Sequence, residues 1–176
     1  VVGSVPQVKA TVNSSGANAV FMTTSSASAL PLLSQLLPEA GIKSPDTQFI
    51  GLTRWDIPPQ TLSLPGVQGG WFALPDPAAT SAFSQKFVAA YGQSPHPLAG
   101  LAFDGIAAVG ALVQSGNSNA LTGASLTQGA GFRGASGIFR LRGDGTNERG
   151  LAIATISNQS VQILEGAPQA FGGVGF

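Results

Sequence analysis

The chain has 176 residues, in which eight Lys and Arg balance eight Asp and Glu. Only 9% of the residues are charged, so the sequence lacks the basic clusters that nucleic acids and anionic membranes recruit. The 43% hydrophobic content argues against disorder, and no apolar run approaches the roughly 18 residues that span a bilayer. This length and composition predict a globular, loop-rich chain of about one domain.

Few residues are suited to catalysis or metal binding. Cysteine is absent, which excludes a thiolate nucleophile, disulfides and Cys-based zinc sites. The single histidine, His96, lies between two prolines, where we expect an exposed loop residue. Residues 129–134 match the pattern G-x-G-x-x-G, but a strand follows them where a dinucleotide site needs a helix. We therefore expect no enzyme activity, no metal and no cofactor.

The first 115 residues alternate between predicted strands and helices. In chain order the pattern predicts a helix at 8–15, strands at 17–22, 48–52 and 70–74, and helices at 26–40, 76–92 and 98–114. The strands are short apolar runs of the kind that a parallel sheet buries on both faces. The expected fold class is α/β, a parallel sheet flanked by helices.

The tail has a different character. Short β-rich runs at 136–142, 151–157 and 161–164 are separated by turn residues, which predicts an antiparallel meander, and 166–176 is expected to be irregular. The tripeptide Arg142-Gly143-Asp144 falls where a hairpin turn is needed. Arg140, Arg142 and Arg149 are expected on solvated faces, some of them paired with Glu148.

Two loops after predicted strands are the candidate ligand-binding residues. Thr23, Thr24, Ser25 and Ser26 follow the first strand, where hydroxyls and a helix N-terminus would suit a small carboxylate; the alternative is an ordinary serine cap. The run Arg54-Trp55-Asp56 follows the second strand. Its Arg offers a fork for a carboxylate and its Trp an aromatic wall; in the alternative, Arg54 pairs with Asp56 and Trp55 covers core.

Asp104 is a third candidate, because it lies within a predicted helix close to the apolar face. A carboxylate in this position either caps a neighbouring element or binds an amine. The sequence favours the structural role and leaves the other open.

The order of these segments resembles the second half of a type I periplasmic binding protein of the branched-chain amino-acid receptor kind. The resemblance covers nearly the whole chain. It is carried by the run from Ala19 to Ser26, Phe49-Ile50-Gly51, Tyr91-Gly92, residues 101–106 and Gly143-Asp144-Gly145. Within that superfamily, residues 51–56, 69–77 and 145–151 most resemble the penicillin-binding-protein activator (LppC-like) branch.

The resemblance implies two α/β lobes joined by a hinge, with a ligand site in the cleft between them. Residues 1–97 would form most of the C-terminal lobe, and residues 98–176 would return to the N-terminal lobe as a helix and the terminal strands. The rest of that lobe would lie outside this chain, which we therefore expect to be a fragment.

The function implied is non-catalytic binding of a small polar ligand, an amino acid or a derivative, in the bacterial periplasm. A membrane transporter of the ABC kind would be the partner, and a lipid anchor would lie on a segment outside this chain. The activator branch implies the alternative, contact with a peptidoglycan synthase. Phe103 and Gly105 depart from the receptor pattern, where Tyr and Ala are usual.

Overall fold

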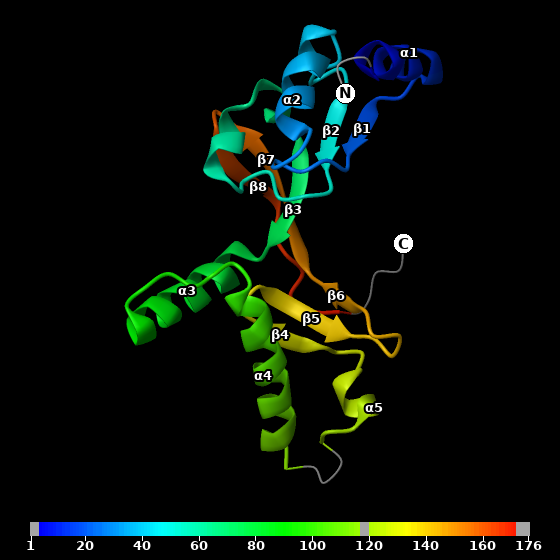
Figure 1. The fold of residues 1–176 in the computed structure, drawn as a ribbon. Coiled ribbons are helices and arrows are strands. Elements are labelled where there is room, and N and C mark those ends of the chain that lie inside the picture. Colours follow the sequence, from blue (N-terminus) through cyan, green and yellow to red (C-terminus); the bar gives the residue numbers. More distant parts are fainter. Residues whose placement is uncertain (1–3, 117–119, 172–176) are drawn as a thin grey trace. The chain divides into compact units, whose positions relative to one another are not determined.

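A computed structural model of the chain describes residues 4–116 and 120–171 (Figure 1). The chain folds into two compact units. The first comprises Val1–Leu74 with Ile153–Glu165, and the second comprises Pro75–Ala152 with Gly166–Phe176. Strands β3 (Trp71–Pro75) and β7 (Leu151–Ser157) both run through the boundary. The chain therefore changes unit inside β3, inside β7 and again after β8.

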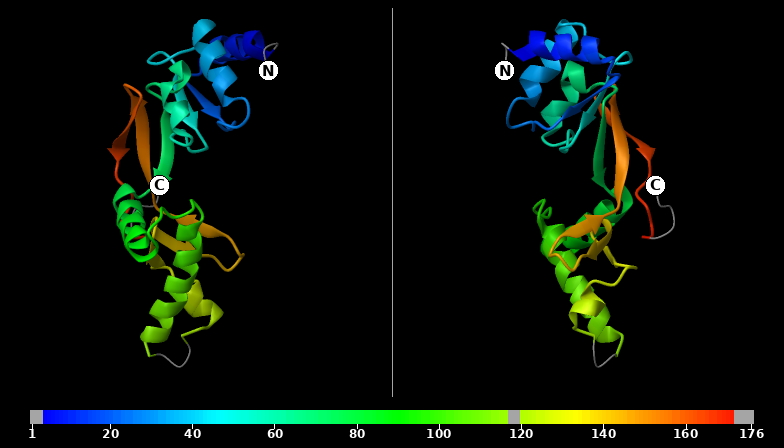
Figure 2. Two further views of the ribbon diagram at one scale, coloured as in Figure 1. Left: turned by 60° about the vertical axis from the view of Figure 1, so that its left-hand side comes forward. Right: turned by 90° about the vertical axis from the view of Figure 1, so that its right-hand side faces the viewer.

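The first unit is built on a five-stranded sheet in the order β1-β2-β3-β7-β8. Its other elements are α1 (Val5–Ser15), β1 (Ala19–Met22), α2 (Leu30–Glu39), β2 (Gln48–Gly51), the 3-10 helices η2 (Pro59–Ser63) and η3 (Pro65–Val67), and β8 (Ser160–Glu165). Strands β1, β2 and β3 are parallel, whereas β7 and β8 form an antiparallel hairpin. Figures 1 and 2 show this hairpin, in orange and red, beside β3.

The core of the first unit is rich in aromatic residues and lies on one face of this sheet. Phe49, Trp55 and Phe72 are at most 1% exposed, and α2 contributes Leu30 and Leu37 to the same interior. The opposite face is different, since Phe21 on β1 is 62% exposed and Trp71 on β3 is 43% exposed. The prediction that these strands are buried on both faces is therefore wrong for this chain.

The second unit combines helices with a small antiparallel sheet. It contains α3 (Pro77–Tyr91), α4 (Ala99–Gln114), α5 (Gly123–Leu126), β4 (Phe132–Gly134), β5 (Gly137–Leu141) and β6 (Asn147–Arg149). The sheet order is β4-β5-β6, with Phe132 opposite Phe139. Ala108 and Leu112 of α4 pack on these two rings to form the unit's core.

Most predicted elements are confirmed, and so is the α/β class. Asp76 caps α3 as predicted, because its carboxylate accepts hydrogen bonds from the N–H groups of Ala78 and Ala79 at 2.9 and 3.2 Å. Gly92 ends that helix in the left-handed conformation that glycine favours, with φ of 70°. Helix α2 begins at Leu30 with Ala29 at its N-cap and without a side-chain cap, so the ordinary serine cap considered for residues 23–26 is not formed.

The tail is not one meander. Strands β5 and β6 form a hairpin of the second unit, whereas β7 and β8 join the parallel strands of the first. The two compact units divide between Leu74 and Pro75. The change of lobe near residue 97, which the resemblance implies, stays a prediction. Residues 172–176 of the predicted irregular end lie outside the described residues.

Candidate functional site

The loops that follow β1 and β2 lie against each other. Because these strands are parallel neighbours, their carboxyl ends meet at one edge of the sheet, where α/β proteins commonly bind ligands. The Thr53 hydroxyl donates to the Thr24 carbonyl at 3.2 Å, and the Ser26 hydroxyl donates to the Ile57 carbonyl at 3.0 Å. The structure therefore brings together the two predicted loops and adds Thr53, which the sequence analysis missed.

Internal hydrogen bonds occupy part of the hydroxyl cluster. The Ser25 N–H donates to the Ser28 hydroxyl at 3.1 Å, and the Thr24 hydroxyl lies 3.4 Å from the Ser25 carbonyl. Thr23 is exposed, and its side chain makes no hydrogen bond to any described residue. Thr23 is accordingly the hydroxyl of this cluster that a ligand would reach without breaking an existing contact.

Arg54 and Asp56 pair with each other. The Arg54 Nε donates to Asp56 Oδ1 at 2.6 Å, and a second guanidinium nitrogen contacts Oδ2. The arginine side chain keeps 35% exposure and the aspartate 15%. The Asp56 carboxylate thus fills the fork that the sequence analysis offered to a ligand carboxylate.

Trp55 is part of the core. It is completely buried, and its ring stacks on Phe72 with centroids 6.2 Å apart and planes inclined by 28°. A Cβ at either Gly51 or Gly70 would collide with the indole, so both glycines are needed for the ring to lie on β2 and β3. The indole N–H is buried with no hydrogen-bond partner among the described residues. This geometry agrees with the core-covering alternative for Trp55.

Asp104 belongs to the second unit and is 1% exposed. Its Oδ1 accepts from the Ala135 N–H at 2.6 Å, and its Oδ2 accepts from the Arg149 guanidinium at 2.7 Å. A Cβ at Gly134 would collide with this carboxylate. Both oxygens therefore join α4 to the β4–β5 turn and to β6, which agrees with the structural alternative. The expectation that Arg149 lies on a solvated face is wrong, because its side chain is 23% exposed.

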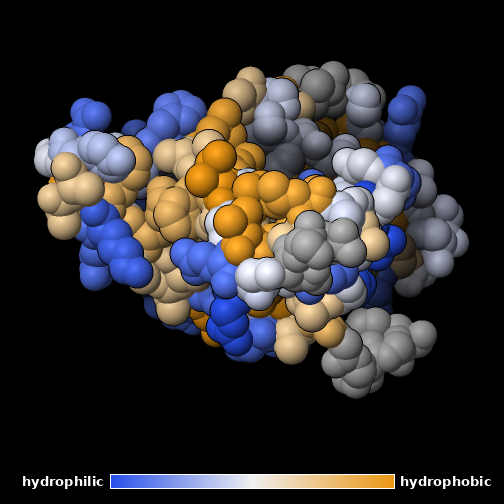
Figure 3. Space-filling model, turned by 90° about the horizontal axis from the view of Figure 1, so that it is seen from below, coloured by the Kyte–Doolittle hydropathy of each residue, from blue (hydrophilic) through white to orange (hydrophobic). Residues whose placement is uncertain are grey.

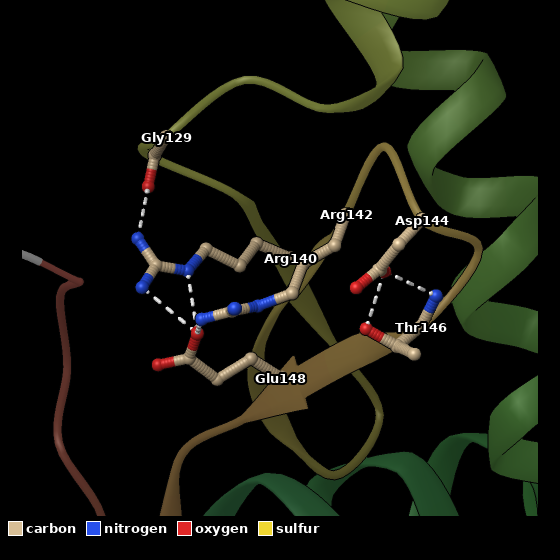
Figure 4. A network of polar contacts seen from close by, with 6 residues as sticks. All are labelled: Gly129, Arg140, Arg142, Asp144, Thr146 and Glu148. Atoms are coloured by element: carbon tan, nitrogen blue, oxygen red, sulfur yellow. Dashed lines mark hydrogen bonds and ion pairs between the residues drawn. The ribbon is translucent and has the colours of Figure 1, made fainter.

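The β5–β6 hairpin holds a polar network in which Arg142-Gly143-Asp144 forms the turn, as predicted (Figure 4). Arg140 and Arg142 both donate to Glu148 Oε2, at 2.8 and 2.6 Å. The hydrogen bond from Arg142, followed by that from Arg140, lowers the pKa of Glu148. The Thr146 hydroxyl and N–H lower the pKa of Asp144 in the same way. These contacts close the turn and leave no carboxylate of the network free.

A pocket of about 380 Å³ lies in the second unit between α3 and α4. It is lined by Phe83, Phe87, Tyr91 and Phe103, and Lys86 is its charged lining residue. The aromatic face of α3 was predicted from its spacing, but the pocket was not. A ligand site usually adds several convergent polar groups to an apolar wall, which this pocket lacks.

Residues 4–116 and 120–171 contain no group of three His, Cys, Asp or Glu side chains that could hold a metal ion. The described helices include none that is both long and apolar enough to cross a membrane.

Comparison with known proteins gives a family match and several structural matches. A family model described as "Periplasmic binding protein" matches residues 4–160. A putative branched-chain amino acid ABC transporter protein from Rhodospirillum rubrum is 17% identical, with a TM-score of 0.73 over 91% of this chain and 48% of its own. A branched-chain amino acid ABC transporter periplasmic ligand-binding protein from Burkholderia xenovorans is 21% identical, with a TM-score of 0.61 over 97% and 49%.

The C-domain of LpoA from Haemophilus influenzae, described as a regulator of PBP1A, shares the fold as well. It is 17% identical, with a TM-score of 0.53 over 91% of this chain and 49% of that domain. No protein of curated function shows detectable sequence similarity to the chain. The chain spans about half the length of the solved relatives that it matches.

Proposed function

Because the chain belongs to the periplasmic binding protein family, we propose that it is a non-catalytic binding protein for a small polar ligand, an amino acid or a derivative. The ligand would bind at the loops that follow β1 and β2. The observation that carries this proposal is the contact between these loops, which gathers Thr23–Ser26, Thr53 and Arg54 at the carboxyl ends of parallel strands.

A ligand carboxylate has two kinds of partner in these loops. Hydroxyls and backbone N–H groups, with Thr23 the most accessible, can donate to it directly. Arg54 can bind it in bidentate fashion only when Asp56 releases the fork. Asp56 therefore acts as an internal competitor, which would weaken binding of carboxylates and favour ligands that add other contacts.

Thermal unfolding of the chain with a panel of amino acids, each paired with its decarboxylated amine, tests the proposal. A ligand at 100 times its dissociation constant adds about 2.7 kcal/mol to the free energy of unfolding, which is several degrees at this size. We expect an amino acid to raise Tm and its amine to leave Tm unchanged. Thr23→Val should reduce the shift, whereas Thr80→Val on α3 should not. No shift at millimolar concentration would contradict ligand binding.

A second candidate function is regulation of a peptidoglycan synthase through protein contact. Two observations favour it: Asp56 occupies the Arg54 fork, and Trp55 fills the sheet end behind it. Fold similarity to LpoA agrees with this alternative. If no ligand of the panel raises Tm and the chain binds a purified peptidoglycan synthase, regulation is favoured. If a ligand raises Tm and the chain does not bind the synthase, ligand binding is favoured.

The family also supports a location and a partner. We propose that the protein acts in the periplasm and that, with its ligand bound, it docks onto a membrane transporter of the ABC kind. Cell fractionation tests the location, because an antibody should detect the protein in the osmotic-shock fraction. Detection in the cytoplasmic fraction alone would contradict it.

A further inference from the structure

The first unit contains a further pocket, at the end of the sheet opposite to the candidate site. Its volume is about 620 Å³, which is within the range of ordinary ligand sites. One wall is formed by Gln68 and Gly69, just before β3, and the other by the β7–β8 hairpin. Because β1, β2 and β3 are parallel, residues that precede β3 lie at the amino ends of these strands, whereas the candidate site lies at their carboxyl ends. The two sites share no residue.

Neutral polar groups line this pocket. Its hydroxyls and carboxamides include those of six side chains: Gln68, Thr155, Ser157, Asn158, Gln159 and Gln162. None of the described residues that line it is charged. Hydroxyls and carboxamides can each both donate and accept hydrogen bonds. The pocket therefore has the convergent polar groups that the pocket between α3 and α4 lacks.

Hydrogen bonds join the two walls of the pocket. The Gln68 amide nitrogen donates to the Leu62 carbonyl at 2.6 Å, and the Gln68 Oε1 accepts from the Gln159 N–H at 3.3 Å. Beside them, the Gly69 N–H donates to the Ile156 carbonyl at 2.8 Å. The shape of the pocket is therefore set by the fold of the first unit.

The turn of the hairpin keeps a side chain where glycine is usual. Asn158 and Gln159 form a two-residue turn between the paired residues Ser157 and Ser160, and their φ values are 51° and 60°. Asn adopts this left-handed conformation readily, but the second position of such a turn is normally glycine. A glutamine there costs some backbone strain and adds a carboxamide to the pocket wall. Strained residues of this kind cluster at ligand sites.

Polar groups of the hairpin are available to a ligand. Thr155 and Gln162 are cross-strand partners, and Ser157 lies on the same face of β7 as Thr155. Their side chains make no hydrogen bond to any described residue. Ala154 and Ile156, which alternate with them along β7, are completely buried. The hairpin therefore packs its apolar face in the core and presents an uncharged polar face to the pocket.

We propose that this pocket binds a neutral carbohydrate. A charged ligand would lose part of its hydration without meeting an opposite charge on the pocket wall. The hydroxyls of a sugar both donate and accept, so they can pair with either end of each carboxamide and with each hydroxyl of the wall. The volume is sufficient for a short oligosaccharide.

An apolar ligand would find a better surface on the second unit. Ile106 on α4 is 77% exposed, and the molecule seen from below presents a connected hydrophobic area on the side to which the C-terminal end of α4 points in Figure 1 (Figure 3). Apolar patches of that kind favour apolar partners. The polar pocket of the first unit therefore selects a different class of ligand.

The test is binding of neutral saccharides to the 176-residue chain. Lactose and maltotriose, followed by saturation-transfer NMR, represent free sugars, and insoluble chitin in a sedimentation assay represents a polysaccharide. We expect binding of at least one of them, and amide hydrogen exchange of residues 155–162 should then slow by roughly threefold or more.

A double variant locates the binding. Thr155→Val combined with Gln162→Leu removes two free polar groups at similar side-chain volume and should weaken binding by about tenfold. Thr11→Val combined with Gln7→Leu, the same changes at exposed positions of α1, is the matched control and should leave binding unchanged. If the first double variant fails to fold, Gln162→Leu alone replaces it, because Gln162 is exposed on the edge strand β8.

Three results would overturn the proposal. One is the absence of binding to all three saccharides at millimolar concentration. Another is binding that the Thr155 and Gln162 changes leave as strong as before. The third is protection from exchange at the loops that follow β1 and β2 in place of residues 155–162. A failed amino-acid screen does not bear on the proposal, because the two sites share no residue.

Discussion

Each of the two units contains an arginine–aspartate pair, and the two pairs have different roles. Arg54 and Asp56 are two residues apart in one loop of the first unit, and both keep contact with solvent. Asp104 and Arg149 are 45 residues apart in the second unit, and the aspartate is buried. The first pair therefore links only neighbours in a loop, whereas the second joins a helix to a strand that is distant in sequence.

The interiors of the two units also differ in whether they contain a charged group. Trp55, Phe49 and Phe72 provide the packing of the first unit, and its charged pair stays at the edge. In the second unit a carboxylate lies inside and satisfies the Ala135 N–H as well as Arg149. A buried carboxylate whose two oxygens both accept hydrogen bonds inside the protein is not available to a ligand, whereas a partly solvated loop pair can open, so this contrast separates a scaffold contact from a candidate site.

The largest effect is expected at Trp55. Trp55→Ala should lower the free energy of unfolding of the first unit by about 3–5 kcal/mol, because a fully buried ring would leave a cavity over Gly51 and Gly70. Urea unfolding monitored by amide exchange measures each unit separately. Trp55→Phe should cost less, since it keeps an aromatic ring and removes the unpaired indole N–H. Equal losses from the two variants would refute this packing role.

Asp104→Asn comes next and acts on the second unit. Removing the charge leaves Arg149 without its buried carboxylate partner, which should cost about 1.5–3 kcal/mol, the range for a hydrogen bond to a charged group. Asp56→Asn, the matched change in the other pair, should cost less than about 1 kcal/mol because that pair is partly solvated. The same urea titrations measure both values.

A double variant provides a further test of the difference between the buried pair and the loop pair. Arg149→Met combined with Asp104→Asn should recover part of the loss, because neither partner then leaves an unpaired charge. If Asp56→Asn proved as costly as Asp104→Asn, the distinction between a loop pair and a scaffold pair would be wrong.

The α/β class and most elements were predictable because their signals are local. Asp76 before Pro77 and Gly92 after Tyr91 mark the two ends of α3 in the sequence itself. The assignment of β7 and β8 to the first sheet was not predictable, because the same short apolar runs suit either a local meander or pairing with distant β3. Long-range pairing of this kind has no local signal.

The site was predictable only in part. Thr24, Ser26 and Arg54 could be placed at one sheet edge because parallel strands align their carboxyl ends. Whether Arg54 faces a ligand or Asp56 depends on side-chain geometry, which spacing alone does not fix. Asp104 shows the same limit, since its partner Arg149 lies in a segment that the sequence analysis assigned to a solvated face.

A modest effect is expected at Asp76, at the point where the second unit begins. The hydrogen bond from Gln169, with those from the N–H groups of Ala79 and Ala78, holds the pKa of Asp76 below its ordinary value. A carboxyl whose pKa is lowered in the folded state stabilises that state fully above its ordinary pKa, and this contribution is lost as the pH falls through the lowered value. Asp76→Ala should therefore cost about 1 kcal/mol at neutral pH. The deficit relative to the unmodified chain should shrink in acid, as urea titrations from pH 7 to pH 3 would measure. Asp46→Ala, outside any helix cap, is the control, and a deficit at Asp76 that did not change with pH would mean that the carboxylate contributes through packing alone.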